Sequence, residues 1–176
     1  MVEEKDTYSE EYWDRVEKMM GSFSARILHL ENLMGDIMSR HFCSGDGEKG
    51  TLFFSLITPQ MSFRNRTNIL MNMLRIHYKD IYKTYDSDLR KLHEIDQYRN
   101  DLVHLMLAVS EQVHRKDVNS AQIHKSENGK SAIGEINKKE HESKVRLCTK
   151  LATILKIIQR DIIGRGYSPE LSDDSP

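Results

Sequence analysis

Residues 9–39 read SEEYWDRVEKMMGSFSARILHLENLMGDIMS, and this stretch decides the fold class. Its apolar side chains recur at steps of three and four residues, so they fall in one continuous stripe along a single long helix. The spacing fits a bundle helix with a wide inner face better than the narrower seam of a coiled coil. The stripe consists of Tyr12, Val16, Met19, Phe23, Ile27, Leu30, Met34 and Ile37.

The length and composition indicate one globular, helical domain. The chain has 176 residues, of which 38% are hydrophobic and 30% charged, a balance typical of folded proteins. Only three prolines and nine glycines interrupt it, and long stretches without either favour helices. The 26 Lys and Arg residues nearly cancel the 27 Asp and Glu residues, so no overall field attracts nucleic acid or a membrane. Contact with RNA therefore requires a local basic patch or a groove formed by assembly.

The cysteines and the N-terminus argue against metals, disulfides and membranes. Cys43 and Cys148 are too few for a zinc site, and Cys148 falls in an apolar stripe where a buried reduced thiol is expected. The first residues, MVEEKDTYSEEYW, are acidic and polar, unlike a signal peptide. No apolar run approaches the roughly 20 residues that cross a bilayer. We expect a cytoplasmic protein with no cofactor, no metal and no membrane contact.

The remaining elements follow from caps, breakers and periodicity. The predicted elements are helices at about 63–82, 86–114 and 139–163, a polar loop at 43–51, an extended or one-turn segment at 51–57, and a β-hairpin at 121–136 about Asn128-Gly129. Together with the first helix they predict an all-α fold, an antiparallel four-helix bundle with a small β-hairpin before the last helix. The single domain covers 9–163, between a flexible N-terminus at 1–8 and a disordered tail at 164–176.

The third predicted helix carries the best candidate for chemistry, Arg99-Asn100-Asp101-Leu102-Val103-His104. Asp96, Asn100 and His104 are spaced four apart and share one face, with His93 one turn earlier. Arg99 is expected in the inner apolar stripe, where an unpaired charge is costly, so it must find a partner or reach into a cleft.

Arg99 and His104 lie roughly 140° apart on a straight helix, so turning alone does not bring them together. The length of the arginine, a helix distortion or a second subunit has to do so. A second source of positive charge is the predicted helix at 63–82, whose basic residues lie away from its apolar face. They are Arg64, Arg66, Arg75 and Lys79, and they form either a binding strip or a solvated face.

The order of these features resembles a known family. An Arg-polar-x-x-x-His stretch late in a helical sequence is similar to the R-x4-6-H motif of HEPN domains, here at Arg99, Asn100 and His104. Ser62-Phe63, opening an Arg-rich helix, and a hairpin before a Leu/Ile-rich last helix resemble uncharacterised prokaryotic members. The resemblance covers roughly residues 9–163.

The resemblance implies a metal-independent endoribonuclease that works as a homodimer, with motifs from both chains lining one cleft. His104 would be general base toward a ribose 2′-hydroxyl or acid toward the leaving 5′-oxygen, a role that suits its ordinary pKa. Arg99 would hold the scissile phosphate and Asn100 would orient the other groups. The products would be a 2′,3′-cyclic phosphate and a 5′-hydroxyl. A role as a toxin or defence effector, with a cognate antitoxin or inhibitor protein, would follow from the same resemblance.

Four further residues are expected to support this site or to bind RNA: His93, Asp96, Arg64 and Arg66. The main alternative is a non-catalytic HEPN-like module that dimerises, binds RNA or docks on a partner. A carboxylate-bridged di-metal bundle needs two Glu-x-x-His pairs, and only Glu111 and His114 form one. His141, flanked by two glutamates, is expected at a solvated helix start. No nucleophile elbow is present, and helix-turn-helix DNA binding lacks a basic recognition helix.

Overall fold

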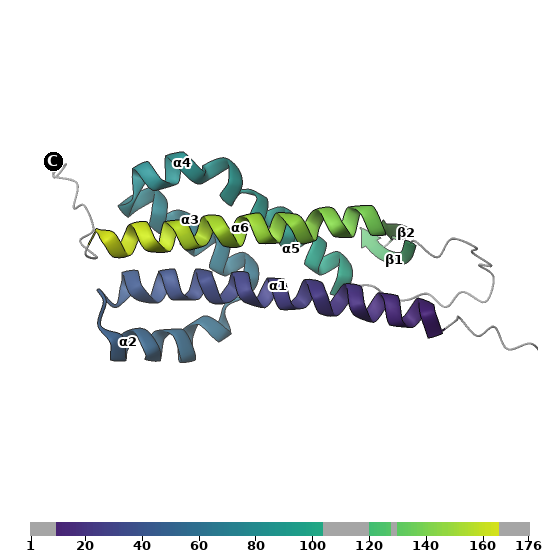
Figure 1. Ribbon diagram of the computed structural model, residues 1–176, viewed down its shortest axis with the longest axis horizontal. Helices are drawn as coiled ribbons and strands as arrows, with labels where there is room; N and C mark the ends of the chain where they lie inside the picture. The colour runs from purple at the N-terminus through teal and green to yellow at the C-terminus, as the bar shows by residue number, and fades with distance from the viewer. Residues whose placement is uncertain (1–9, 104–119, 128–129, 166–176) are drawn as a thin grey trace, which may run out of the picture.

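The computed structural model describes residues 10–103, 120–127 and 130–165, and it is dominated by helices that lie along one another (Figure 1). The predicted all-α class is confirmed. The α-helices are α1 (Glu10–Phe42), α2 (Gly47–Leu52), α3 (Phe63–His77), α4 (Lys79–Leu89), α5 (Lys91–Val103) and α6 (Lys138–Gly164). A π-helical turn (Phe53–Ile57) and a 3-10 turn (Thr58–Gln60) follow α2.

The first and last helices run parallel to each other. Near their N-terminal ends, Ser22 Oγ of α1 lies 3.5 Å from His141 Nε2 of α6. Near their C-terminal ends, Asp36 of α1 accepts a hydrogen bond from Gln159 of α6. Figure 1 shows α1 and α6 side by side, both beginning at the end that carries the strands. In a four-helix bundle of alternating direction the first and last helices are antiparallel, so that prediction is wrong.

The reason is an additional helical pass in the stretch predicted as a polar loop followed by an extended or one-turn segment. α2 and the π-helical turn run back along α1, so the chain reverses once more than expected (Figure 1). Asp46 starts this pass as an N-cap, because its Oδ1 accepts hydrogen bonds from the N–H groups of Glu48 at 3.1 Å and Lys49 at 3.0 Å. The glycines of the stretch disguise the helix in the sequence, since Gly has low helix propensity.

Gly35 lets this pass pack closely against α1. A Cβ atom at Gly35 would lie 3.1 Å from Phe54 Cε2 and 3.3 Å from Thr58 Cγ2, which is closer than ordinary van der Waals contact. Gly21, earlier on the same helix, has nothing within 4 Å of such an atom. The two glycines therefore differ in role, because only Gly35 makes room for a neighbouring segment.

The second and third predicted helices are divided differently from the prediction. α3 ends at His77 because Tyr78 leaves the helical region, with φ −139° and ψ 57°. This turn buries Tyr78, which is 1% exposed, and its hydroxyl lies 3.0 Å from His41 Nδ1. A second break at Arg90 separates α4 from α5. Apolar periodicity does not reveal these breaks, because the helices on both sides contribute to the same core.

The predicted apolar stripes of α1 and α6 form the centre of that core. On α1, the residues Phe23, Ile27, Leu30, Met34 and Ile37 are each at most 5% exposed. The facing residues of α6 are Cys148, Leu151, Ile154, Leu155, Ile158 and Ile162. Cys148 is a free, buried thiol as predicted, and burial raises its pKa to about 11, so it is an unreactive core residue.

Two strands precede α6. β1 (Ser120–Glu127) and β2 (Lys130–Asn137) pair antiparallel, with Ser120 opposite Asn137 and Glu127 opposite Lys130. The predicted turn at Asn128-Gly129 lies outside the described residues. So do the predicted flexible N-terminus at 1–8, nearly all of the tail predicted at 164–176, and the end of the helix predicted to reach His114.

The packing at Gly35 yields a paired prediction. Gly35→Val places branched carbons against Phe54 and Thr58, and we expect it to lower the free energy of unfolding by about 1–3 kcal/mol through overpacking. Gly21→Ala meets no neighbour and gains helix propensity, so it raises the free energy of unfolding by up to about 1 kcal/mol. Urea denaturation followed by circular dichroism measures both. Equal effects of the two variants would contradict the close packing at Gly35.

Candidate functional site

The motif lies at the C-terminal end of α5. Asp96 is buried at 3% exposure, Arg99 and Asn100 are half-buried, and His93 is exposed at the start of the same helix. His104 follows the last described residue of α5 and lies outside the described part of the chain. The structure therefore places three of the four residues of the predicted face, together with Arg99.

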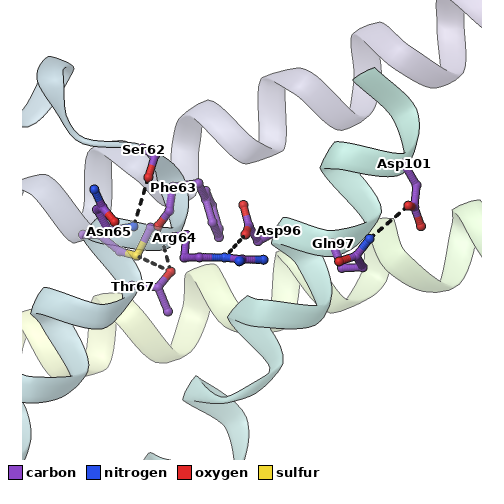
Figure 2. Close-up of polar contacts among 9 residues, drawn as sticks. Ser62, Phe63, Arg64, Asn65, Thr67, Asp96, Gln97 and Asp101 are labelled. Atoms are coloured by element: carbon purple, nitrogen blue, oxygen red, sulfur yellow. Dashed lines mark hydrogen bonds and ion pairs between the residues drawn. The ribbon is translucent and has the colours of Figure 1, made fainter. Parts of the chain in front are cut away.

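Arg64 and Asp96, predicted separately as supporting residues, are brought together by the fold. Arg64 Nε donates a hydrogen bond to Asp96 Oδ2 at 3.0 Å, across the contact between α3 and α5 (Figure 2). The Asp96 side chain is 4% exposed, whereas that of Arg64 is 59% exposed. A buried carboxylate thus holds one edge of a guanidinium whose remainder faces solvent.

Local sequence fixes the position of Arg64. Ser62 is the N-cap of α3, and its Oγ accepts a hydrogen bond from the backbone N–H of Asn65 at 3.2 Å (Figure 2). This cap places Arg64 in the first turn of the helix. Phe63 beside it is fully buried and anchors the turn in the core.

Arg66 does not belong to a basic binding strip, and that prediction is wrong. Its side chain is buried, its Nε donates to the carbonyl of Met61 at 3.2 Å, and its Nη1 lies 4.0 Å from Glu31 Oε2 on α1. Arg66 therefore holds the start of α3 to α1. Arg75 is exposed and bonds Asn72 one turn before it on the same helix.

Arg99 does not lie in the inner stripe, which corrects a second prediction. The stripe of α5 is formed by Leu92, Ile95, Tyr98 and Leu102, at steps of three, three and four. Tyr98 is 3% exposed and occupies the inner position, so Arg99 lies at the edge of the buried face. Arg99 is therefore a half-buried residue beside the core and not a charge inside it.

Tyr98 belongs to a buried polar network that the sequence analysis missed. Its hydroxyl lies 3.0 Å from Nδ1 of His141, which is 6% exposed rather than solvated as predicted. Ser22 Oγ donates to the carbonyl of Met19 at 3.1 Å and lies 3.5 Å from His141 Nε2. Phe23 packs edge-on against the Tyr98 ring, with centroids 4.9 Å apart. The network joins α1, α5 and α6 immediately before Arg99.

The hydrogen bonds assign a neutral tautomer to His141. Because the Ser22 hydroxyl proton points to Met19, the serine oxygen accepts from Nε2–H, and Nδ1 then accepts the Tyr98 proton. Burial, followed by the positive charge of Arg26, lowers the pKa of His141. With its Nε2 protonated, His141 is no base for Ser22, so the trio stabilises the fold rather than activating a nucleophile. Its signal in the sequence was the spacing of His141 with Val145 and Cys148, which continues the α6 stripe.

Neither a metal cluster nor a membrane span is found in the part of the chain that the structure describes. No group of three or more His, Cys, Asp or Glu side chains is arranged there to hold a metal ion. No described helix is both long and apolar enough to cross a bilayer. Comparisons with protein-family models, curated proteins and solved structures found no match.

The His141 network predicts a loss of stability on mild acidification. A histidine whose pKa is lowered by folding binds its proton more readily when unfolded, so stability falls as the pH drops below the ordinary value near 6.5. His41 acts in the same direction, because burial and then His77 lower its pKa. Carboxylates with lowered pKa, such as Asp88 beside Lys150 and Lys91, lose their contribution only at lower pH.

The test compares the wild type with His141→Gln, whose amide can donate and accept hydrogen bonds but does not titrate. We expect the wild type to lose more unfolding free energy than the variant between about pH 7.5 and about pH 5.5, measured by urea denaturation. Equal losses would show that His141 does not take up its proton on unfolding. Tyr98→Phe serves as the companion variant, since it removes the hydroxyl and keeps the ring packing.

Proposed function

We propose that the chain is a metal-independent endoribonuclease of the HEPN type that acts as a homodimer. The observation that supports this best is the position of Arg99 and Asn100. Both are half-buried at the edge of α5, next to a buried carboxylate that holds a second arginine. A cation at such an edge can contact a phosphate while its stem packs on the protein. The resemblance of the motif supplies the chemistry.

The proposed reaction is transesterification within RNA. His104, acting as general base, removes the proton of a ribose 2′-hydroxyl, and the oxygen attacks the adjacent phosphorus. The bond to the 5′-oxygen breaks, and that oxygen takes a proton from a general acid to become a 5′-hydroxyl. The other product is a 2′,3′-cyclic phosphate. Arg99 neutralises charge that develops on the non-bridging oxygens, and Asn100 orients the phosphate or the imidazole.

Two copies of the chain fit this chemistry better than one. The motif contains one histidine, which cannot be base and acid in the same step. Arg99 and His104 are separated by roughly 140° on a regular helix, so one copy does not present both to one phosphate by helix geometry alone. A cleft between two copies would supply a second histidine and a second arginine.

A second candidate function is a non-catalytic module that dimerises or docks on a partner, with or without RNA. The observation favouring it is a group of exposed apolar side chains in and after α2: Leu52, Leu56 and Ile57 are 51%, 62% and 46% exposed. Exposed apolar patches commonly mark interaction sites.

The deciding experiment incubates purified protein with mixed RNA in EDTA and resolves the products on a denaturing gel. We expect the wild type to cleave, and Arg99→Ala and His104→Ala to lose at least about 100-fold in rate, because each removes a group used in the transition state. The new ends should carry a cyclic phosphate that resists ligation until it is opened.

Arg146→Ala is the matched control, because Arg146 is exposed on α6, with its side chain 76% exposed. It should cleave like the wild type. Equal behaviour of wild type, Arg99→Ala and His104→Ala would overturn the nuclease. Light scattering on the same samples measures the molecular mass of the protein in solution. A mass equal to that of one chain would contradict the proposed cleft between two copies.

A further inference from the structure

Arg64 is placed against the preference of its own helix. It lies in the first turn of α3, which contains no acidic residue. The N-terminal end of a helix is the positive end of its dipole, so a cation there is unfavourable. Helix stability therefore does not explain an arginine at this position, and the contact with Asp96 offsets the repulsion.

The contact uses only part of the guanidinium. Arg64 Nε donates to Asp96 Oδ2, and within the described residues Nη1 and Nη2 have no polar partner. An arginine has five donors in a fixed plane, and a carboxylate that holds Nε leaves the outer edge free to bind a second anion. Figure 2 shows the Arg64 side chain extended from α3 toward α5, with the end of the guanidinium beyond the dashed contact to Asp96.

The same carboxylate relates Arg64 to the motif. Asp96 and Arg99 are three residues apart on α5, so they lie on neighbouring turns of adjoining faces. The Arg64 guanidinium is thus held at a position of α5 that lies three residues, or about one helical turn, before Arg99. Two arginines one turn apart are spaced for neighbouring phosphates of one strand.

We infer that Arg64, positioned by Asp96, binds the phosphodiester of single-stranded RNA next to the one held by Arg99. This inference rests on the proposed function and deepens it, since it assigns a second phosphate subsite. Arg64 is a binding residue here, and Asp96 is a positioning residue that acts through it. A purely structural ion pair would affect folding stability and leave RNA affinity unchanged.

The experiment measures binding separately from cleavage. The probe is a fluorescein-labelled 2′-O-methyl oligonucleotide of about 20 nucleotides and mixed sequence, which lacks the attacking hydroxyl and stays intact. Fluorescence anisotropy at several salt concentrations gives the slope of log K against log salt. Loss of one phosphate contact on a single strand reduces that slope by about 0.7.

We expect Arg64→Ala to reduce the slope by about one contact and to weaken binding about tenfold at low salt. Arg64→Lys keeps the charge, so it should preserve most of the slope and bind less tightly than wild type. Arg75→Ala is the control, because Arg75 is exposed on the same helix and, among the described residues, hydrogen-bonds only to Asn72. Circular dichroism confirms that each variant is folded.

The outcomes separate the inference from the proposed function. Suppose that the wild type binds, that Arg99→Ala reduces the slope of log K against log salt, and that Arg64→Ala leaves this slope unchanged. That result would overturn the subsite and leave the proposed function standing. No binding by the wild type would overturn both. A reduced slope for Arg75→Ala equal to that for Arg64→Ala would show a diffuse basic surface, which also overturns the subsite.

Discussion

The parallel packing of α1 on α6 is the constraint on which the rest of the structure depends. Each helix buries a long apolar stripe, and contacts near both ends fix their common direction. Two parallel helices at the ends of a chain require an even number of reversals between them. The chain meets this requirement with α2 and its π-helical turn, which return along α1, and with α4 and α5, which return along α6. Contacts between α4 or α5 and α6, such as Asp88 with Lys150, follow from the second return.

The sequence predicted the features that depend on local residue spacing, and it missed the points at which the chain reverses or breaks a helix. The stripes of α1 and α6 and the burial of Cys148 followed from spacing, because burial of one face imposes a period on the residues themselves. The return pass was missed because its glycines hide a helix whose stability comes from packing on Gly35 and from the Asp46 cap. The break at Tyr78 was missed because a tyrosine buried outside the helix leaves no signature in periodicity.

The candidate site shows the same division. Spacing correctly grouped Asp96 with Asn100 on one face of α5, but it assigned Arg99 to the core because it overlooked Tyr98 one residue earlier. The Tyr98 ring can occupy the inner position of the helix because its hydroxyl donates a hydrogen bond to His141. The two residues are 43 positions apart, so no rule based on local sequence pairs them. The pairing of Arg64 with Asp96 is equally non-local, since it depends on α3 and α5 lying side by side.

Buried polar groups thus determine where the two arginines of the candidate site, Arg64 and Arg99, lie. The buried carboxylate of Asp96 accepts a hydrogen bond from Arg64 and holds its guanidinium in place. The Tyr98–His141 hydrogen bond fixes the turn of α5 that carries Arg99. This matters because the chain has a net charge of only −1, so long-range attraction contributes little to binding a polyanion. Under the proposed function, affinity for a phosphate would come from a few oriented donors, and orienting a donor costs side-chain entropy unless the fold has already restricted the side chain. A guanidinium held at one edge by a buried carboxylate has lost much of that freedom before a ligand arrives.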